Sequence, residues 1–361
     1  MTVDVMNGND GNRSGSTASV DAIVIGGGPA GLGAALGLCR QRHGVVVFDS
    51  GEYRNEKASH MHMVATWDHQ HPHDFRTAAR KELLSRYGNN VNGSGSCSFI
   101  DQPVATLERY YEDEVKPAGS GLPRTTSFRL VDASGVSYTA KSVVLATGSP
   151  DILPSIDGFE DCWGRKVYHC LLCHGFEESG NATTIGILAR DAFADVASLQ
   201  RIVRACRQFS HDITIYTHGN TRLAAHLQPM MAAHSSVRAI ESKSIQQVRL
   251  TGPAGEGGIR VALSGGRQAE HGFLVYKPMT EQCSHLPEAL ALDMDEDGDI
   301  VVQPPFGTTS VPGVFAAGDC ASGNKFFAAA SVMGSAAGAG AAAYLQAKSQ
   351  GMNGSLTVAF Q

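Results

Sequence analysis

The sequence predicts an α/β protein with two Rossmann-like domains of three-layer ββα type, the first of which is discontinuous. Two strand–helix–strand patterns carry this prediction: one begins at Val20, and the other has a first strand that ends near Leu188. A third observation is that motifs typical of the first domain return near Gly318, after the second pattern. The first domain therefore comprises 20–149 and 276–348, and the inserted domain comprises 150–275.

The composition is that of a globular chain without a basic excess. The 361 residues are 42% hydrophobic and 18% charged, with a net charge of −6, which argues against nucleic acid or an anionic membrane as partner. Residues 1–19 lack a signal-peptide layout and predict a disordered lead, and 349–361 predict a tail. No run of about 18 apolar residues occurs. Most of the eight cysteines lie in apolar segments, which indicates reduced thiols and a cytoplasmic protein.

The first strand–helix–strand pattern contains a dinucleotide-binding turn. Its residues are Gly26, Gly28, Pro29, Ala30 and Gly31, with glycines at G-x-G-x-x-G spacing. Gly26 permits the tight turn, Gly28 lets a pyrophosphate approach the backbone, and Gly31 lets the helix and strand pack closely. The helix N-terminus offers amide donors to the phosphates. Asp49 ends the second strand, 18 residues past Gly31, where it can accept hydrogen bonds from ribose hydroxyls.

Two later motifs indicate which dinucleotide binds. "KSVVLATGS" ends an apolar strand in Ala146, Thr147 and Gly148, and "TSVPGVFAAGDC" contains Gly318 and Asp319. They resemble the A-T-G and G-D motifs of flavoproteins with two dinucleotide domains. The resemblance implies FAD as cofactor, with Asp319 on the ribityl chain and the helix after it facing the flavin pyrimidine.

The inserted domain has lost the glycines of such a turn. If Gly186 is aligned with Gly26, Leu188 and Asp191 stand at the positions of Gly28 and Gly31. If the alignment is shifted so that Asp191 follows the glycine positions, Leu188, Ala189 and Arg190 occupy them. Either way, side chains fill the space that a pyrophosphate needs. We therefore favour a flavoprotein that no nicotinamide reduces. The alternative is that NADPH still binds through an unusual loop, with Arg190 on a phosphate.

Cys170 and Cys173 form a Cys-x-x-Cys pair with a histidine on either side. A structural zinc site needs four ligands, usually from a second comparable pair, and no second Cys-x-x-Cys occurs. Inert core cysteines are a further alternative. A redox pair is the favoured interpretation, because the spacing allows an intramolecular disulfide and such pairs commonly have a thiolate of lowered pKa.

Together, the three FAD motifs and the Cys-x-x-Cys resemble low-molecular-weight thioredoxin reductases over nearly the whole chain. Those enzymes have Asp after the second cysteine, whereas this chain has His174. The histidine and the degraded nicotinamide turn are similar to a narrower branch, the gliotoxin-type dithiol oxidases that close disulfides in epipolythiodiketopiperazine-like products. The branch implies a homodimer and O2 as electron acceptor, with H2O2 released. The resemblance also implies FAD contacts at Ser50, Arg54, Asn55 and Val104.

The resemblance implies a thiol–disulfide exchange mechanism. A small-molecule dithiol attacks the disulfide of Cys170 and Cys173, forms a mixed disulfide and leaves as its own disulfide. We expect Cys173 to face the flavin and Cys170 to face the substrate. His174 is the candidate base, because histidine titrates near neutral pH, and His169 is a weaker candidate.

Residues 60–73 are rich in histidine, at His60, His62, His69, His71 and His73. Spacings of two residues do not place successive side chains on one face of a helix. Trp67 and Pro72 indicate an ordered loop that lines a pocket. We therefore expect contact with flavin or substrate and no bound metal.

Three functions remain open from the sequence. The favoured one is an O2-dependent dithiol oxidase of secondary-metabolite biosynthesis or self-protection. The second is an NADPH-dependent disulfide reductase. The third is a protein that sequesters a dithiol metabolite without turnover.

Overall fold

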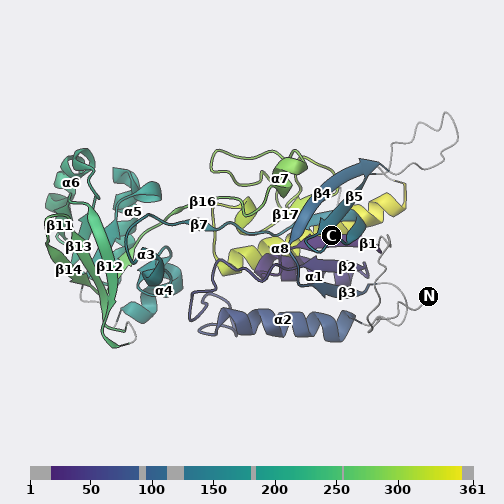
Figure 1. Cartoon of the computed structure of the whole chain (residues 1–361), viewed down its shortest axis with the longest axis horizontal. Coiled ribbons are helices and arrows are strands. Elements are labelled where there is room, and N and C mark those ends of the chain that lie inside the picture. Colours follow the sequence, from purple (N-terminus) through teal and green to yellow (C-terminus); the bar gives the residue numbers. More distant parts are fainter. Residues whose placement is uncertain (1–17, 89–94, 112–125, 180–183, 254–255, 352–361) are drawn as a thin grey trace. The chain divides into compact units, whose positions relative to one another are not determined.

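The computed structural model describes residues 18–88, 95–111, 126–179, 184–253 and 256–351 (Figure 1). The expected lead and tail lie almost entirely outside these residues. The chain divides into two compact units: unit 1 comprises Met1–Tyr53, His73–Ser149 and Gln282–Gln361, and unit 2 comprises Arg54–Pro72 and Pro150–Glu281.

Unit 1 contains one mixed sheet in the order β3-β2-β1-β6-β5-β4, with β17 also paired to β6. Its strands are β1 (Ala18–Ile25), β2 (Val45–Phe48), β3 (Cys97–Ile100), β4 (Val104–Tyr111), β5 (Thr126–Asp132), β6 (Ser137–Leu145) and β17 (Val314–Ala316). β3, β2, β1, β6 and β17 are parallel, whereas β4 and β5 pair antiparallel. The C-terminal segment thus completes the sheet that the N-terminal segment begins.

The two faces of this sheet bury alternate residues of each strand. Ala22 and Val24 of β1 pack in a cluster with helix residues, whereas Ile23 and Ile25 pack in a second cluster with residues of β4 and β5. The helices of unit 1 are α1 (Pro29–Arg40), α2 (Pro72–Tyr87), α7 (Leu286–Ala289) and α8 (Phe327–Ser349). The result is the predicted three-layer arrangement.

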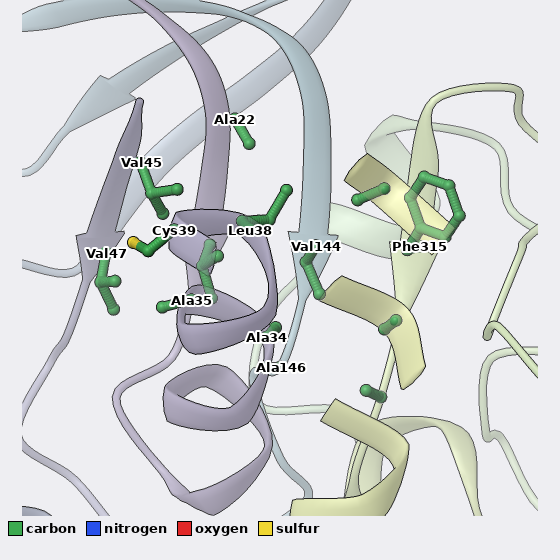
Figure 2. Packing of buried hydrophobic residues seen from close by; sticks show 14 of the residues in the cluster. Ala22, Ala34, Ala35, Leu38, Cys39, Val45, Val47, Val144, Ala146 and Phe315 are labelled. Atoms are coloured by element: carbon green, nitrogen blue, oxygen red, sulfur yellow. The ribbon is translucent and has the colours of Figure 1, made fainter. Parts of the chain in front are cut away.

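Helices α1 and α8 pack side by side with their backbones in contact (Figure 1). A Cβ added to Gly334 would lie 2.0 Å from the carbonyl oxygen of Ala30, and one added to Gly338 would lie 2.4 Å from that of Ala34. Figure 2 shows Leu38 and its neighbours filling the space between α1 and the strands. Only glycine allows so close an approach.

α8 is long and apolar enough to cross a membrane by length and composition alone, and half of its most apolar window is buried inside the structure. That burial, against α1 and the sheet, is typical of the core helix of a globular unit.

Unit 2 has a parallel sheet in the order β11-β10-β9-β15-β8 and a three-stranded antiparallel sheet, β12-β13-β14. The parallel strands are β8 (Val167–Tyr168), β9 (Ile185–Leu188), β10 (Ile213–Tyr216), β11 (Val237–Glu241) and β15 (Phe273–Val275). The antiparallel strands are β12 (Ile245–Thr251), β13 (Gly258–Leu263) and β14 (Gln268–His271), and β7 (Asp151–Ile152) pairs with β16 (Met279–Thr280). This is the predicted second strand–helix–strand domain.

The helices of unit 2 are α3 (Phe159–Cys162), α4 (Leu171–Glu178), α5 (Val196–Cys206) and α6 (Thr221–Ala233). Residues of α4, α5 and α6 pack with one face of the parallel sheet, and residues of α3, β12 and β13 pack with the other.

The segment Arg54–Pro72 was expected in the first domain and groups with unit 2. Its polar contacts explain this, because Arg54 pairs with Asp151 and Lys57 with Glu160. Residues 276–281, also expected in the first domain, group with unit 2 as well, where β16 pairs with β7.

We predict that Gly338→Ala destabilises the protein, although alanine is the better helix former by about 1 kcal/mol. The clash with the Ala34 carbonyl oxygen should cost about 1–3 kcal/mol, so the thermal midpoint of the FAD-bound protein should fall. The matched control is Val332→Ala on the exposed side of α8, which should leave the midpoint unchanged or raise it slightly. A stabilised Gly338→Ala protein would contradict the close packing.

His271 predicts a pH-dependent stability. It is buried, its two ring nitrogens contact Thr184 Oγ1 (3.0 Å) and Tyr216 Oη (2.6 Å), and burial lowers its pKa from 6.5 to about 4. The unfolded chain therefore binds a proton that the folded chain does not, and stability should fall as the pH falls from 6.5 towards 4.

The free energy of unfolding is measured by urea titration at about pH 7.5 and at about pH 5. Between these two pH values, it should fall by about 2 kcal/mol more in the wild-type protein than in His271→Gln. Equal losses in the two proteins would show that His271 keeps its ordinary pKa in the fold.

Candidate functional site

The glycine turn between β1 and α1 has the geometry of a phosphate cradle. A Cβ on Gly26, whose φ is +114°, would lie 2.1 Å from the Ala146 carbonyl oxygen, and one on Gly31 would lie 1.8 Å from that of Gly26. A Cβ on Gly28 would meet nothing within 4 Å, so this residue borders open space at the N-terminus of α1. Pro29 is the first residue of the helix and Ala30 is buried behind it. The turn therefore has room for a pyrophosphate beside free amides.

Asp49 is buried at the end of β2 and is held by its neighbours. Its carboxylate accepts hydrogen bonds from Tyr53 Oη at 2.6 Å and from the Gly51 amide at 3.1 Å. Burial and this carboxylate raise the pKa of Tyr53, over which the Arg76 guanidinium stacks at 3.7 Å. Sequence reasoning missed Tyr53, because its distance from Asp49 matches no dinucleotide motif. Ser50 is exposed beside this site.

The two later motifs lie together at the ends of β6 and β17. The Ala317 amide donates to Leu145 O, and Ser149 Oγ donates to Asp319 O at 3.0 Å. Gly318 has a φ of +82°, and a Cβ there would lie 2.8 Å from Ala30 Cβ. The A-T-G and G-D segments therefore meet the N-terminal half of α1, as a shared cofactor site requires.

Several buried polar atoms of unit 1, besides His43 Nε2, lack a hydrogen-bond partner among the described residues. They are Thr147 Oγ1, Gln282 Oε1, Ser284 Oγ and Ser331 Oγ, all in unit 1. Leaving a buried polar atom unpaired costs about 1–3 kcal/mol, and a polar ring bound here would remove that cost. The Cys283 thiol donates to Thr147 O at 3.0 Å. The residues present thus fit FAD, and Gln282 and Ser284 add a contact segment that no sequence motif marked.

The other expected FAD contacts are placed differently. Val104 begins β4 and packs against the second core cluster of unit 1. Arg54 and Asn55 belong to unit 2. The Arg54 guanidinium binds both carboxylate oxygens of Asp151, at 3.0 and 2.6 Å, and Asn55 O accepts from the Ala58 amide. Their role towards FAD stays a prediction.

Cys170 and Cys173 form a disulfide, with their Cα atoms 5.3 Å apart. Cys170 is the residue before α4, and Cys173 lies in its first turn. Leu172 and Phe176 of the same helix are 75% and 82% exposed, which is unusual for large apolar side chains. A Cβ on Gly175 would lie 2.6 Å from the Phe209 ring, so α4 packs tightly into unit 2 at this position. The disulfide therefore sits on a fixed helix with an apolar outer face.

Both flanking histidines are packed against aromatic rings. The His174 ring stacks on Tyr168 with centroids 4.6 Å apart, and His169 stacks on Trp163 at 5.7 Å. Burial lowers the pKa of His174 to about 4, and burial together with the nearby Arg54 charge lowers that of His169 to about 3. Both imidazoles are therefore neutral at pH 7. Tyr168 is anchored in turn by Glu178, whose carboxylate also binds Lys166.

The corresponding turn of unit 2 has side chains at the positions that glycines occupy in unit 1. Leu188 and Ala189 are buried, and Asp191 has a φ of +50° and accepts a hydrogen bond from Tyr276. The Asp195 carboxylate caps the N-terminus of α5 by accepting from the Ser198 amide at 2.9 Å. A carboxylate at this end of a helix occupies the position of a phosphate and repels it. The spacing D-V-A-S is an N-cap signal that the sequence analysis had not used.

The histidine-rich segment forms a loop in which His62 and His69 approach α4. The His62 ring lies 5.3 Å from the His69 ring and 6.3 Å from the His174 ring, between centroids. His60 stacks on His69 at 4.1 Å. His71 and His73 are exposed at the end of the loop and the start of α2.

Comparison with known proteins agrees with this geometry. The sequence profile of the pyridine nucleotide-disulphide oxidoreductase family matches residues 20–343. A thioredoxin reductase of Gibberella zeae is 41% identical over an alignment of 354 residues that covers 91% of this chain and 98% of that protein. Thioredoxin reductase aclD of Aspergillus oryzae is 38% identical, over 83% of this chain and 88% of that protein. Among solved structures, HlmI is 28% identical with a TM-score of 0.78, over 93% of this chain and 96% of that one.

Two Rossmann-like units, an FAD cradle in the first and a disulfide in the second define a thioredoxin reductase-like flavoprotein. The chain belongs to the pyridine nucleotide-disulphide oxidoreductase family. It is an FAD-dependent oxidoreductase, and the cofactor and fold expected from the sequence are confirmed.

We predict that Thr147→Val weakens FAD binding about tenfold, the effect of losing one hydrogen bond of about 1.4 kcal/mol. The measurement is the dissociation constant of FAD, obtained by titrating FAD into the apoprotein and following flavin fluorescence. Thr217→Val is the matched control, because Thr217 Oγ1 is also buried without a partner among the described residues but lies in unit 2. A similar loss in both variants would assign the effect to folding.

Proposed function

We propose that this flavoprotein oxidises a small-molecule dithiol to a disulfide through Cys170 and Cys173, with O2 as the electron acceptor. The observation that carries the proposal is the difference between the two Rossmann turns. The turn at Gly28 borders open space, whereas the N-terminus of α5 is capped by the Asp195 carboxylate. A cofactor site is therefore kept in unit 1, and the equivalent position in unit 2 disfavours a nicotinamide dinucleotide.

The proposed reaction balances in electrons and protons. One thiolate of the substrate attacks a sulfur of the disulfide, and its second thiol then breaks the mixed disulfide. The substrate loses two electrons and two protons and becomes a disulfide, and Cys170 and Cys173 become thiols. FAD, when bound, supplies a two-electron acceptor for this pair, and O2 takes up the two electrons and two protons as H2O2.

The residues of α4 have separate proposed roles. Cys170 receives the substrate, and Cys173 exchanges electrons with the flavin, as the family resemblance implies. Cys173 lies in the first turn of α4, where the partial positive charge of the helix N-terminus favours a thiolate. His174 follows it and is fixed by stacking on Tyr168. Because burial lowers its pKa to about 4, the neutral imidazole can accept a hydrogen bond from a thiol but is a weaker base than the sequence suggested. His169 is the weaker candidate for this role.

The exposed flank of α4 supports a compact apolar substrate. Leu172 and Phe176 follow each other by one helical turn and border the disulfide. Similar fungal relatives, among them sirT of Leptosphaeria maculans at 34% identity over 83% of this chain and 86% of that protein, carry the name thioredoxin reductase. We propose that this chain belongs to the gliotoxin-type branch and acts in secondary-metabolite biosynthesis or self-protection, as a cytoplasmic homodimer.

The names of the relatives favour a second candidate, an NADPH-dependent disulfide reductase. Arg190, half-buried beside the turn of unit 2, is the residue that such an enzyme would use for a phosphate. The two functions differ in which reductant reaches the flavin.

The deciding experiment is anaerobic mixing of the FAD-loaded protein with dithiothreitol or with NADPH, followed by the flavin absorbance. We predict rapid bleaching by the dithiol, negligible bleaching by NADPH, and H2O2 formation once air is admitted. Bleaching by NADPH at the rate of turnover would establish the reductase instead. Tight retention of a dithiol without bleaching would indicate sequestration.

Variants assign the residues in the same assay. Cys170→Ser and Cys173→Ser should each abolish disulfide turnover while FAD stays bound, and His174→Ala should slow it about tenfold to a hundredfold. Cys39→Ala is the control, since Cys39 and Cys97 are buried free cysteines of one core cluster in unit 1. Loss of turnover in Cys39→Ala, with FAD content intact, would transfer the redox role to that pair.

A further inference from the structure

The histidine-rich loop is a closed turn that brings two distant histidines together. The Met61 amide donates to Gln70 O at 2.8 Å, and the His69 amide donates to Met61 O at 2.9 Å. This pairing returns the chain on itself, so His69 lies beside His62 although seven positions separate them. Met63, Thr66 and His69 have φ values of +66°, +70° and +59°, which bend the segment out of strand geometry.

Both histidines face one carboxylate on α4. His62 Nε2 lies 3.4 Å from Glu177 Oε1, and His69 Nδ1 lies 3.8 Å from the same oxygen. One ligand atom from each of the three residues falls within 4.8 Å of the other two. Two donor atoms bound to one zinc ion at 2.0–2.1 Å stand about 3.3 Å apart in a tetrahedron. The observed separations are close to that value and longer than good hydrogen bonds.

In contrast to the expectation from the sequence, we propose that His62, His69 and Glu177 form a binding site for a divalent late first-row metal ion. Zn²⁺ represents this class in the experiment below. Two imidazole nitrogens select this class over Mg²⁺ and Ca²⁺, which prefer oxygen ligands. Three protein ligands leave a fourth position open. The His69 side chain is 57% exposed, so an ion in solution can reach the site.

A second carboxylate supports the ligand role of His62. Asp68 Oδ1 lies 3.6 Å from His62 Nδ1, the ring nitrogen that does not face Glu177. The same oxygen accepts a hydrogen bond from the Met63 amide at 2.8 Å, which fixes its position. A carboxylate behind a ligating histidine holds the ring in the tautomer that leaves the other nitrogen free for the metal. The His62 side chain is only 7% exposed, so its orientation is set by packing.

The position of the site gives it a connection to the disulfide. Glu177 follows Cys173 by one turn of α4 and His174 by three residues, so these side chains share one face of the helix. A bound cation would add positive charge on this face and would hold the loop 61–70 against α4. Both effects would be the same in a dithiol oxidase and in a disulfide reductase, so this proposal does not rest on the proposed function.

The experiment is calorimetric titration of Zn²⁺ into tag-free, FAD-loaded protein with its disulfide oxidised. Cys283, the exposed free thiol, is replaced by serine in every sample so that it cannot bind zinc. We expect one Zn²⁺ per chain with a dissociation constant in the micromolar range or below. His62→Ala and Glu177→Gln should each weaken binding about a hundredfold, and Asp68→Asn about tenfold.

The control variant is His73→Ala, an exposed histidine just beyond the loop, which should leave the affinity unchanged. Glu177→Gln keeps the test valid if His62→Ala fails to fold, because the Glu177 side chain is partly exposed on the helix surface. Absence of binding, or binding that survives Glu177→Gln, would overturn the proposal. Equal weakening by His73→Ala would do so too, because it would indicate unspecific binding to surface histidines.

Discussion

The backbone contact between α1 and α8 is the constraint on which the cofactor site depends. α1 follows the glycine turn, and α8 follows the G-D motif almost three hundred residues later. A side chain at Gly334 or Gly338 would overlap the α1 backbone. Because these positions have no side chain, the two helices approach closely enough for Gly318 to meet Ala30 and for the β6 and β17 ends to share one site. Glycines thus allow the C-terminal segment of the discontinuous domain to pack against its N-terminal segment.

The two Rossmann units show how one supersecondary structure can keep or lose a ligand site. In both units, parallel strands are covered by helices on one face of the sheet. In unit 1, the helix amides after Gly28 stay available to a phosphate. In unit 2, the Asp195 carboxylate accepts a hydrogen bond from the Ser198 amide at the start of α5, and Leu188 is buried. The fold survives because most of its core is formed by the strands and the helix faces that pack on them.

α4 gathers the chemistry of unit 2 on a single short helix. Its N-terminal end carries the disulfide, its buried side packs on Phe209, and its next turn carries Glu177 towards the histidine loop. The stacked His174 is neutral because the surrounding rings exclude water. A redox disulfide, a fixed imidazole and one ligand of the candidate metal site therefore depend on the placement of α4.

The fold and the motifs were readable from the sequence because they depend on local patterns. Glycine spacing, apolar strands and the Cys-x-x-Cys each act over a few residues, and the relevant geometry follows from them. The burial of unpaired polar atoms at Thr147, Gln282 and Ser284 and the convergence of His62 and His69 on Glu177 could not be predicted, because residues far apart in sequence create these environments. The sequence alone thus determined the two Rossmann units, the identity of the cofactor as FAD and the position of the cysteine pair. The tertiary structure alone decided which buried oxygens are left unpaired in the cofactor site and which histidines lie beside a carboxylate, since those environments arise only when distant segments pack together.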